Sequence, residues 1–448
     1  MNHETKLPLL DYACPEDDFA LLEGKPVSRR RFLDDVWRAA ALLPDQPYAI
    51  NLCESRYHFA VAFAAVVLRG QTNLLPPDQL SNTLEEISAT YSSCYVLSDL
   101  EKQSTDSLLA HKINFTHNGF TASDETDRSA EIPAEQVAAI LFTSGSTGKP
   151  VANAKSWKQL VTGAKLILQR FGLNAEKKYS LVATVPQQHM FGLECALLVP
   201  LFGRVQLQSQ SPFYPDDVRQ ALEDAPSPRL LITTPMHLRA CTKAGCNWPA
   251  IDSVVSATDN LDVGMAAEAE AALSTKIYEI YGCTEAGALA TRRTVTDINW
   301  RLLPGMTMQA TQNTAVIHGP QLTEPVPIQD IVEVHTETEF ELLGREFDLI
   351  KVAGKRASLA DLNIKLRSVS GVEDAVFIAP DKKDGPGARL TAIIVAPDTE
   401  ADAVLNELGK MLDPVFLPRP LLKVDKLPRA VTGKLPHEAL MQLLKQIN

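Results

Sequence analysis

One short stretch of this chain combines glycines, hydroxyl side chains and a lysine directly after an apolar run. Val137–Phe142 is apolar, as in a buried strand, and is followed by Thr143-Ser144-Gly145-Ser146-Thr147-Gly148-Lys149-Pro150. Glycines let successive backbone N–H groups turn toward one point, while hydroxyls add donors and the lysine adds positive charge. The stretch therefore predicts a polyphosphate-binding loop at the end of a buried strand.

This loop differs from a Walker phosphate loop, in which four residues separate the glycines and Ser or Thr follows the lysine. Only two residues lie between Gly145 and Gly148, and Pro150 follows Lys149. A flexible surface turn rich in Ser and Gly is the alternative interpretation. The apolar strand in front of the stretch favours the phosphate-binding one.

The composition is that of an ordinary soluble enzyme. The chain has 448 residues, of which 45% are hydrophobic and 22% charged. Its densest apolar stretch, Phe59–Leu68, is shorter than the roughly 20 residues that cross a bilayer. Met1–Leu10 lacks the apolar core of a secretion signal. We therefore expect a cytoplasmic protein without a membrane span.

The net charge of −12 is unevenly distributed: the residues from Arg345 onward carry +2 and the preceding part −14. An acidic surface repels phosphate backbones, so nucleic-acid binding is not expected. Seven scattered cysteines and nine dispersed histidines form neither CxxC pairs nor a zinc-binding quartet. Any metal is expected to arrive with a ligand.

Strand-like and helix-like segments alternate up to about residue 290, which predicts a layered α/β architecture. Ser28 is expected to cap a helix over Arg29–Leu43, whose basic run Arg29-Arg30-Arg31 we interpret as a solvated face. Tyr57–Leu68 is expected to form a buried helix. Ser156 is expected to cap a helix with one apolar face, made of Leu160, Ala164, Ile167, Leu168 and Phe171.

The pattern changes after Gly344. Phe340–Leu343 and Leu349–Val352 predict a hairpin, and Ser358 is expected to open a helix. Further elements are expected over Val376–Ile378, Leu390–Val395, Ala401–Met411 and His437–Ile447. We therefore predict a large layered α/β domain over residues 1–344 and a small α+β domain over residues 345–448.

The phosphate loop resembles that of the adenylate-forming superfamily of acyl-CoA synthetases, peptide-synthetase adenylation domains and luciferases. Three later segments resemble other signatures of that family in the same order: Tyr281-Gly282-Cys283-Thr284-Glu285, Gly344–Arg356 and Pro428–Lys434. Four ordered matches are far more specific than one motif. The resemblance implies that the small C-terminal domain is mobile and rotates about a hinge.

The resemblance also implies contacts to ATP. Thr143–Lys149 would bind the phosphates, Tyr281 and Gly282 would lie against adenine, and Thr284 would bond the α-phosphate. Glu285 would hold Mg²⁺, an ion that prefers carboxylate and phosphate oxygens. Ala257-Thr258-Asp259 takes the place of the adenine-binding turn, although the usual glycines and proline are absent.

Further along, the resemblance assigns Asp330 and Arg345 to the ribose hydroxyls and Arg356 to a phosphate. Lys434 would be the mobile catalytic cation at the α-phosphate, where charge develops as a carboxylate attacks. His189 matches a histidine near the acyl pocket. An exposed loop aspartate, a satisfied core histidine and a solvated C-terminal loop are the alternatives for Asp330, His189 and Lys434.

Some positions depart from the family pattern. Val151 replaces the lysine that usually follows the proline, and either Lys149 or Lys155 could substitute for it. The usual position of the hinge acid holds Phe347, and Asp348 comes next. Cys283 has no neighbouring base in the sequence, so we interpret it as a packing residue.

The expected function is ATP-dependent activation of a carboxylic acid to an acyl adenylate, with release of pyrophosphate and transfer to a thiol. Gly344–Leu359 is similar to compact ligases of aryl polyene-type clusters, which implies an aromatic or medium-chain acid. The acceptor is CoA or a phosphopantetheinylated acyl carrier protein. The alternatives are a regulatory module that binds an acyl adenylate or nucleotide without catalysis, and a structural protein. Glu285, Arg345 and Lys434 together favour the ligase, because binding alone does not require the lysine.

Overall fold

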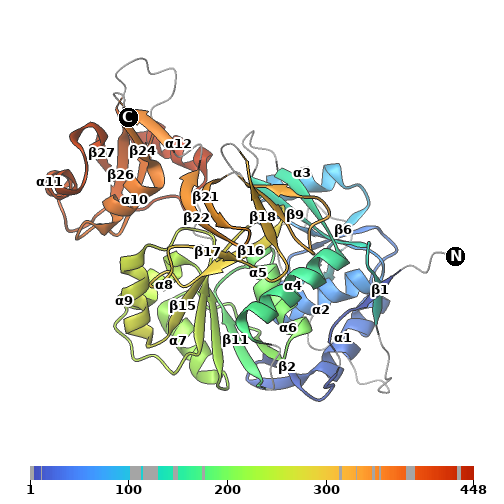
Figure 1. The fold of residues 1–448 in the computed structure, drawn as a ribbon. Coiled ribbons are helices and arrows are strands. Elements are labelled where there is room, and N and C mark those ends of the chain that lie inside the picture. Colours follow the sequence, from blue (N-terminus) through green and yellow to red (C-terminus); the bar gives the residue numbers. More distant parts are fainter. Residues whose placement is uncertain are drawn as a thin grey trace. The chain divides into compact units, whose positions relative to one another are not determined.

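The computed structural model describes residues 5–11, 13–100, 112–114, 130–144, 150–173, 177–311, 315–328, 330–345, 349–352, 355–379, 389–430 and 435–447. The chain forms two compact units (Figure 1). The first comprises Met1–Thr307 and His318–Pro325, and the second Met308–Ile317 and Val326–Asn448. The boundary expected at residue 344 therefore falls inside the second unit.

The first unit contains a mostly parallel sheet with the strand order β17-β16-β15-β14-β13-β11-β12-β2-β3. These strands are β2 (Asp18–Leu22), β3 (Lys25–Ser28), β11 (Tyr179–Ala183), β12 (Val205–Gln208), β13 (Arg229–Thr233), β14 (Ser253–Ser256), β15 (Lys276–Cys283), β16 (Gly287–Arg292) and β17 (Trp300–Leu302). Strands β11, β13, β14 and β15 are parallel neighbours. Their carboxyl ends therefore meet at one edge, where ligands bind in sheets of this kind.

Helices cover both faces of this sheet. The helices α7 (Pro215–Asp224), α8 (Pro235–Lys243) and α9 (Val263–Leu273) lie on one face (Figure 1). Leu231 of β13 packs in the core on that side, whereas its neighbours Leu230 and Ile232 face α4 (Trp157–Phe171). Burial on both faces explains the continuous apolar run Leu230-Leu231-Ile232 in β13, in place of an alternation with polar residues.

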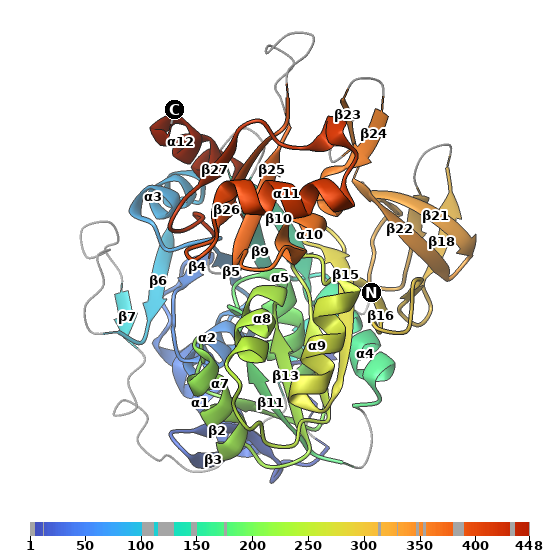
Figure 2. The ribbon, with the colours of Figure 1, turned by 90° about the vertical axis from the view of Figure 1, so that its left-hand side faces the viewer.

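A second sheet in this unit has the order β10-β9-β5-β4-β6-β7. Its strands are β4 (Tyr48–Asn51), β5 (Thr72–Leu75), β6 (Cys94–Ser98), β7 (Lys112–Asn114), β9 (Val137–Ser144) and β10 (Pro150–Ser156), and Figure 2 shows β6 beside β7. The buried helix α2 (Arg56–Leu68) contacts β4 and β5, and α3 (Ser81–Thr90) packs against the sheet through Leu84 and Ile87. Strands β1 (Lys6–Pro8) and β8 (Glu131–Pro133) form a separate antiparallel pair.

The helices expected in this unit are confirmed. Helix α1 (Arg29–Leu42) begins after Ser28, whose hydroxyl accepts a hydrogen bond from the N–H of Arg31 at 3.1 Å. Ser156 and Gln159 form a capping box at the start of α4, and the predicted apolar face of α4 is buried up to Leu168. Phe171 is half-buried. None of the described helices combines the length and apolarity needed to cross a bilayer.

The interpretation of Arg29 as part of a solvated face is wrong. Its side chain is buried, and its guanidinium group donates hydrogen bonds to the carbonyl oxygens of Asp11, Pro200, Leu201 and Gly203. Three of these acceptors lie about 170 residues further along the chain. Only the tertiary fold brings them together, so the local basic pattern gave no sign of them.

In the second unit the predicted hairpin is also wrong. Strand β22 (Glu339–Arg345) pairs with β21 (Asp330–Thr336), and β23 (Leu349–Val352) pairs with β24 (Lys355–Ser358). Both predicted strands are present, but they do not pair with each other. Each pairs with a strand that the sequence pattern did not predict. Strands β18 (Thr307–Ala310), β19 (Ala315–His318) and β20 (Val326–Pro327) form a further small sheet.

The last part of the second unit is the predicted α+β arrangement. Strands β25 (Asp374–Ile378), β26 (Thr391–Val395) and β27 (Leu421–Lys423) form a sheet, with helices α10 (Leu359–Ser368), α11 (Ala401–Met411) and α12 (His437–Ile447). Residues of β26 alternate between two clusters. Ala392 and Ile394 pack with α10 and α11, and Ile393 and Val395 pack with α12. The sheet is therefore covered on both faces.

Candidate functional site

The predicted phosphate loop connects two antiparallel strands. Thr143 and Ser144 end β9, where they pair with Val151 and Pro150 of β10. Residues Gly145–Lys149 lie outside the described residues. On its other side β9 pairs with β5 in parallel, so the strand that leads into the loop is held from both sides. The expected buried strand in front of the loop is confirmed.

The acidic segment lies at the end of β15. Tyr281 and Thr284 are half-buried and Glu285 is exposed, in the turn that leads to β16. The register with β16 shifts between Tyr281 and Gly282. A Cβ at Gly282 would lie 2.3 Å from the carbonyl oxygen of Gly287, so only glycine fits this close approach. After the register shift, Gly282 and Cys283 pair with Ala288 and Gly287, so β15 stays in the sheet up to the turn.

Lys155 of β10 connects the phosphate-loop hairpin to this turn. Its side chain is only 4% exposed, and its Nζ donates a hydrogen bond to the backbone carbonyl oxygen of Glu285. Burial lowers the pKa of Lys155, while the nearby Glu194 carboxylate opposes that shift. Lys149 and Lys155 were the two candidates to replace the lysine that is missing at Val151. Lys155 lies at the acidic turn, and Lys149 is outside the described residues.

Glu194, which no motif in the sequence indicated, is buried beneath the same turn. It begins the short π-helix η2 (Glu194–Leu198), which lies between α5 (Met190–Leu193) and α6 (Val199–Phe202). Its Oε2 accepts a hydrogen bond from the N–H of Ala288 at 2.9 Å, and burial raises its pKa to about 7. The signal that could have revealed it is a single acid within the apolar run Phe191–Phe202.

The ring of Tyr281 lies against Trp300, with 5.6 Å between the ring centroids. The guanidinium group of Arg292 lies over the Trp300 ring, 4.6 Å from its centroid. Glu279 forms an ion pair with Arg292 at 2.7 Å. Glu279 also accepts a hydrogen bond from the N–H of Leu261 at 3.1 Å. This buried acid therefore connects the strand that carries Tyr281 to the segment after β14.

That segment holds the predicted adenine-binding turn. Ala257 is buried, Thr258 is half-buried and Asp259 is exposed. Thr258 has φ +84°, in a region that suits glycine and strains a β-branched residue. The turn thus has a glycine-like backbone although the sequence has no glycine there.

His189 lies half-buried at the N-terminus of α5, in the loop that follows β11. Gly192 permits this loop to pack closely, because a Cβ there would lie 2.0 Å from the carbonyl oxygen of Pro186. The fully buried Arg56 donates to the carbonyl oxygens of Ala183 at 2.9 Å and Val185 at 3.2 Å. These contacts position the chain just before His189.

In the second unit, Asp330 and Arg345 are direct cross-strand partners in the β21–β22 pair. Asp330 is half-buried. Arg356 pairs with Lys351 between β24 and β23. Lys434, the predicted catalytic cation, and the two hinge candidates Phe347 and Asp348 lie outside the described residues.

The acidic turn suits a magnesium ion that is shared with a nucleotide. An exposed carboxylate at Glu285 matches the oxygen ligands that Mg²⁺ prefers, and Mg²⁺ usually uses only one or two carboxylates together with phosphates. The described residues contain no group of three His, Cys, Asp or Glu side chains that could hold a metal by themselves. Burial and the nearby Glu285 raise the pKa of Cys283 to about 11, which disfavours a thiolate nucleophile.

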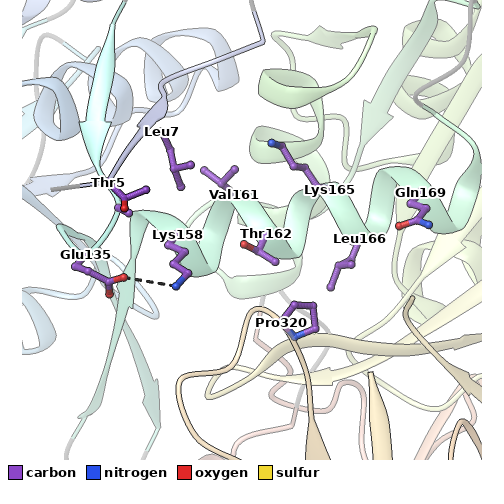
Figure 3. A pocket seen from close by; sticks show the side chains of 11 residues that line it. Thr5, Leu7, Glu135, Lys158, Val161, Thr162, Lys165, Leu166, Gln169 and Pro320 are labelled. Carbon is purple, nitrogen blue, oxygen red and sulfur yellow. Dashed lines mark ion pairs between the residues drawn. The ribbon is translucent and has the colours of Figure 1, made fainter. Parts of the chain in front are cut away.

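A surface cavity of about 390 Å³ lies away from these residues, along the outer side of α4 (Figure 3). It is lined by Lys158, Thr162 and Lys165 of the helix, together with Leu7 and Pro320. Lys158 forms an ion pair with Glu135 at 3.7 Å at one end of it. None of the predicted site residues lines this cavity.

A doubly covered parallel sheet with a Ser/Gly-rich hairpin loop beside an acidic turn defines a nucleotide-binding enzyme of the adenylate-forming class. The sequence profile described as AMP-binding enzyme matches residues 33–335. The chain belongs to this family.

Among characterised relatives, the chain is 26% identical over 303 residues to a 4-coumarate--CoA ligase of Halorhodospira halophila, covering 65% of this chain and 73% of the relative. It is 28% identical over 269 residues to a 4-coumarate--CoA ligase of Rhodobacter capsulatus, covering 60% of this chain and 66% of the relative.

Solved structures show the same fold. The ATP-bound MatB of Rhodopseudomonas palustris superposes with a TM-score of 0.82 at 18% identity, covering 98% of this chain and 97% of MatB. The o-succinylbenzoate CoA synthetase MenE of Bacillus subtilis, in complex with the acyl-adenylate intermediate, gives a TM-score of 0.81 at 19% identity, covering 97% of this chain and 98% of that one. MenE was also solved with ATP and a magnesium ion.

Proposed function

We propose that this protein is an AMP-forming acid–thiol ligase. The observation that carries the proposal is the hydrogen bond from Lys155 to the carbonyl oxygen of Glu285, which brings the phosphate-loop hairpin and the acidic turn together. A nucleotide whose phosphates lie at the loop then has a carboxylate beside it that suits Mg²⁺. Family membership and the names of the relatives support the same reaction class.

Each part of the nucleotide has candidate partners in this chain. Thr143–Lys149 would bind the phosphates, with Thr284 at the α-phosphate and Glu285 holding Mg²⁺, which would neutralise phosphate charge. Tyr281 and Gly282, with the turn Ala257–Asp259, would bind the adenine.

Asp330 and Arg345 would bind the ribose hydroxyls. Arg356 would contact a phosphate, since a guanidinium group stays charged and forms paired hydrogen bonds to such oxygens. These assignments come from motif positions, and the register of β21 and β22 supports the pairing of the first two residues.

The chemistry consists of two displacements. A carboxylate oxygen of the acid attacks the α-phosphorus, the bond to the pyrophosphate oxygen breaks, and pyrophosphate leaves. Lys434 would neutralise the charge that builds up on the phosphorus oxygens during this step. A thiol sulfur then attacks the acyl carbon, loses its proton and displaces AMP. His189, in the loop after β11, would lie near the acyl group.

We infer CoA as the favoured thiol acceptor and an aromatic acid as the favoured substrate, because two relatives are named 4-coumarate--CoA ligase. A medium-chain acid and a phosphopantetheinylated carrier protein are the alternatives that the experiment must separate. Whichever acid is the substrate, the same relatives support a small carboxylic acid as the substrate class.

The test is ATP-dependent hydroxamate formation over a panel of aromatic and aliphatic acids, followed by thioester formation with CoA or a carrier protein. We expect pyrophosphate release with at least one acid, and its loss in Glu285→Gln. The exposed Glu268→Gln on α9 is the matched control and should retain activity. Nucleotide binding without any pyrophosphate release would instead support the regulatory module.

A further inference from the structure

Two buried ionisable side chains, one basic and one acidic, hold the turn that carries Glu285. Lys155 and Glu194 are each 4% exposed. The amino group of Lys155 donates to the carbonyl oxygen of Glu285. The carboxylate of Glu194 accepts from the N–H of Ala288 at 2.9 Å. A basic and an acidic side chain thus bind the two ends of one four-residue turn.

Two glycines make room for the Glu194 carboxylate. A Cβ at Gly287 would lie 2.4 Å from its Oε1, and a Cβ at Gly163 of α4 would lie 3.0 Å from it. Gly287 also has φ +77°, which favours glycine. The carboxylate therefore occupies a place formed by α4, η2 and the start of β16.

Stability alone does not account for this arrangement. Removing a charge from water costs several kcal/mol per ion, and well-packed apolar residues in place of a buried pair are often neutral or stabilising. Lys155 and Glu194 attract each other electrostatically, but each also makes a hydrogen bond to the backbone of the turn. Their shared effect is on the position of that backbone.

We propose that Lys155 and Glu194 are positioning residues that hold the turn so that the Glu285 carboxylate is placed to bind the magnesium ion of the nucleotide. The proposal rests on the proposed function, because it assumes that Glu285 serves the metal. Lys155 lies on β10, the strand that leaves the phosphate loop. The same contact therefore joins β10 directly to the acidic turn.

The direct test measures ATP binding by calorimetry with and without Mg²⁺. In Lys155→Met, which keeps most of the apolar stem, the gain in ATP affinity caused by Mg²⁺ should fall by about tenfold or more, as for residues that orient metal ligands. Lys155→Arg should restore part of the gain because a guanidinium group also donates to a carbonyl. Lys165→Met, on the exposed side of α4, should keep the wild-type gain.

A second variant covers the case in which Lys155→Met fails to fold. Glu194→Gln keeps the shape and an oxygen acceptor for Ala288 but removes the charge. It should reduce the Mg²⁺-dependent gain below that of the wild type, and an unchanged gain in this variant would overturn the proposal. Where Lys155→Met folds, the loss in Glu194→Gln should be the smaller of the two. In the double variant, the loss should be smaller than the product of the two single losses, because the residues act on one turn.

Kinetics separate positioning from general stability. In Lys155→Met the KM for ATP should rise while the KM for the acid changes by less than about twofold. A lower melting temperature together with equal losses in all the kinetic constants would overturn the proposal. So would an increase in ATP affinity with Mg²⁺ in Lys155→Met that is as large as in the wild type. If the wild-type protein itself binds no ATP, the proposed function is wrong instead.

Discussion

Asp330 and Arg345 stand directly opposite each other in the antiparallel pair β21–β22. They are separated by 15 positions in the sequence, and they are the two residues that the family resemblance assigns to the ribose hydroxyls. Directly opposed residues have Cβ atoms about 5 Å apart, a spacing at which an acid and a base can share one small ligand. We therefore propose that this pair forms the ribose site.

Replacing Asp330 should weaken ATP binding through the loss of its hydrogen bonds to the ribose hydroxyls. Asp330→Ala is expected to raise the Kd for ATP by about ten- to a hundredfold, since a hydrogen bond to a charged group contributes about 1.5–3 kcal/mol. Titrations with ATP and with 2′- and 3′-deoxy-ATP measure this. The wild type should bind deoxy-ATP more weakly than ATP. Asp330→Ala should bind the two nucleotides with nearly equal affinity. The exposed Glu333→Ala on the same strand should behave as wild type.

Thr258→Gly should stabilise the protein. The left-handed φ of +84° strains threonine, and glycine adopts it freely. Relief of strain of roughly 1–3 kcal/mol, offset by about 1 kcal/mol of added freedom in the unfolded chain, should leave a gain of up to about 2 kcal/mol. Thermal unfolding checks this. Asn260→Gly, in the same turn but without a positive φ, should be neutral or destabilising. A lower melting temperature for Thr258→Gly would argue against strain.

Glu279→Ala should destabilise the first unit by about 3–5 kcal/mol, as expected when one partner of a buried ion pair is removed. The substitution leaves Arg292 without its carboxylate and also removes the acceptor for Leu261 N–H and the Thr294 hydroxyl. Urea unfolding measures the change. The exposed Glu268→Ala on α9 should shift stability by less than about 0.5 kcal/mol, and an equal effect of both changes would contradict the prediction.

Acid should destabilise the protein partly through His237. Burial lowers its pKa to about 4, and its Nε2 has no hydrogen-bond partner. The unfolded chain binds this proton below about pH 6.5 and the folded chain only below about pH 4, so protonation favours unfolding in that window. Between pH 7 and pH 4.5 the loss from this group should be about 2 kcal/mol.

Urea unfolding at the two pH values tests this sign and size. His237→Gln should lose less stability than the wild type on acidification. The exposed His335→Gln should keep the wild-type pH dependence. Identical pH dependence in His237→Gln and the wild type would show that His237 is not responsible.

Lys434→Ala should reduce acyl-adenylate synthesis by about a hundredfold or more, the size of effect seen when one charge-stabilising donor is removed. Thioester formation from a supplied acyl adenylate should be largely retained, because in that step the thiol attacks the acyl carbon and phosphorus is not attacked. Rapid-quench measurement of each half-reaction separates the two. Lys445→Ala on α12 is the matched control. Equal loss in both half-reactions would refute the assigned role.

Local signals in the sequence determined many of the elements. Ser28 and Ser156 cap helices because their hydroxyls bond N–H groups only three residues away. The apolar run before Thr143 forms a strand, and Ala401–Met411 and His437–Ile447 form helices within the expected limits. The ordered motifs also indicated the family, since each motif is a short contiguous pattern whose chemistry does not depend on knowing its neighbours.

Contacts between distant residues were decided only by the tertiary structure. The acceptors of Arg29 lie near residue 200, and Lys155 meets Glu285, which is 130 positions away. The pairing of β22 with β21 and of β23 with β24 likewise depended on which strands lie side by side. The same local sequence can place a charged side chain in solvent or in the core. The free energy of burying that side chain depends on the partners that the rest of the fold supplies.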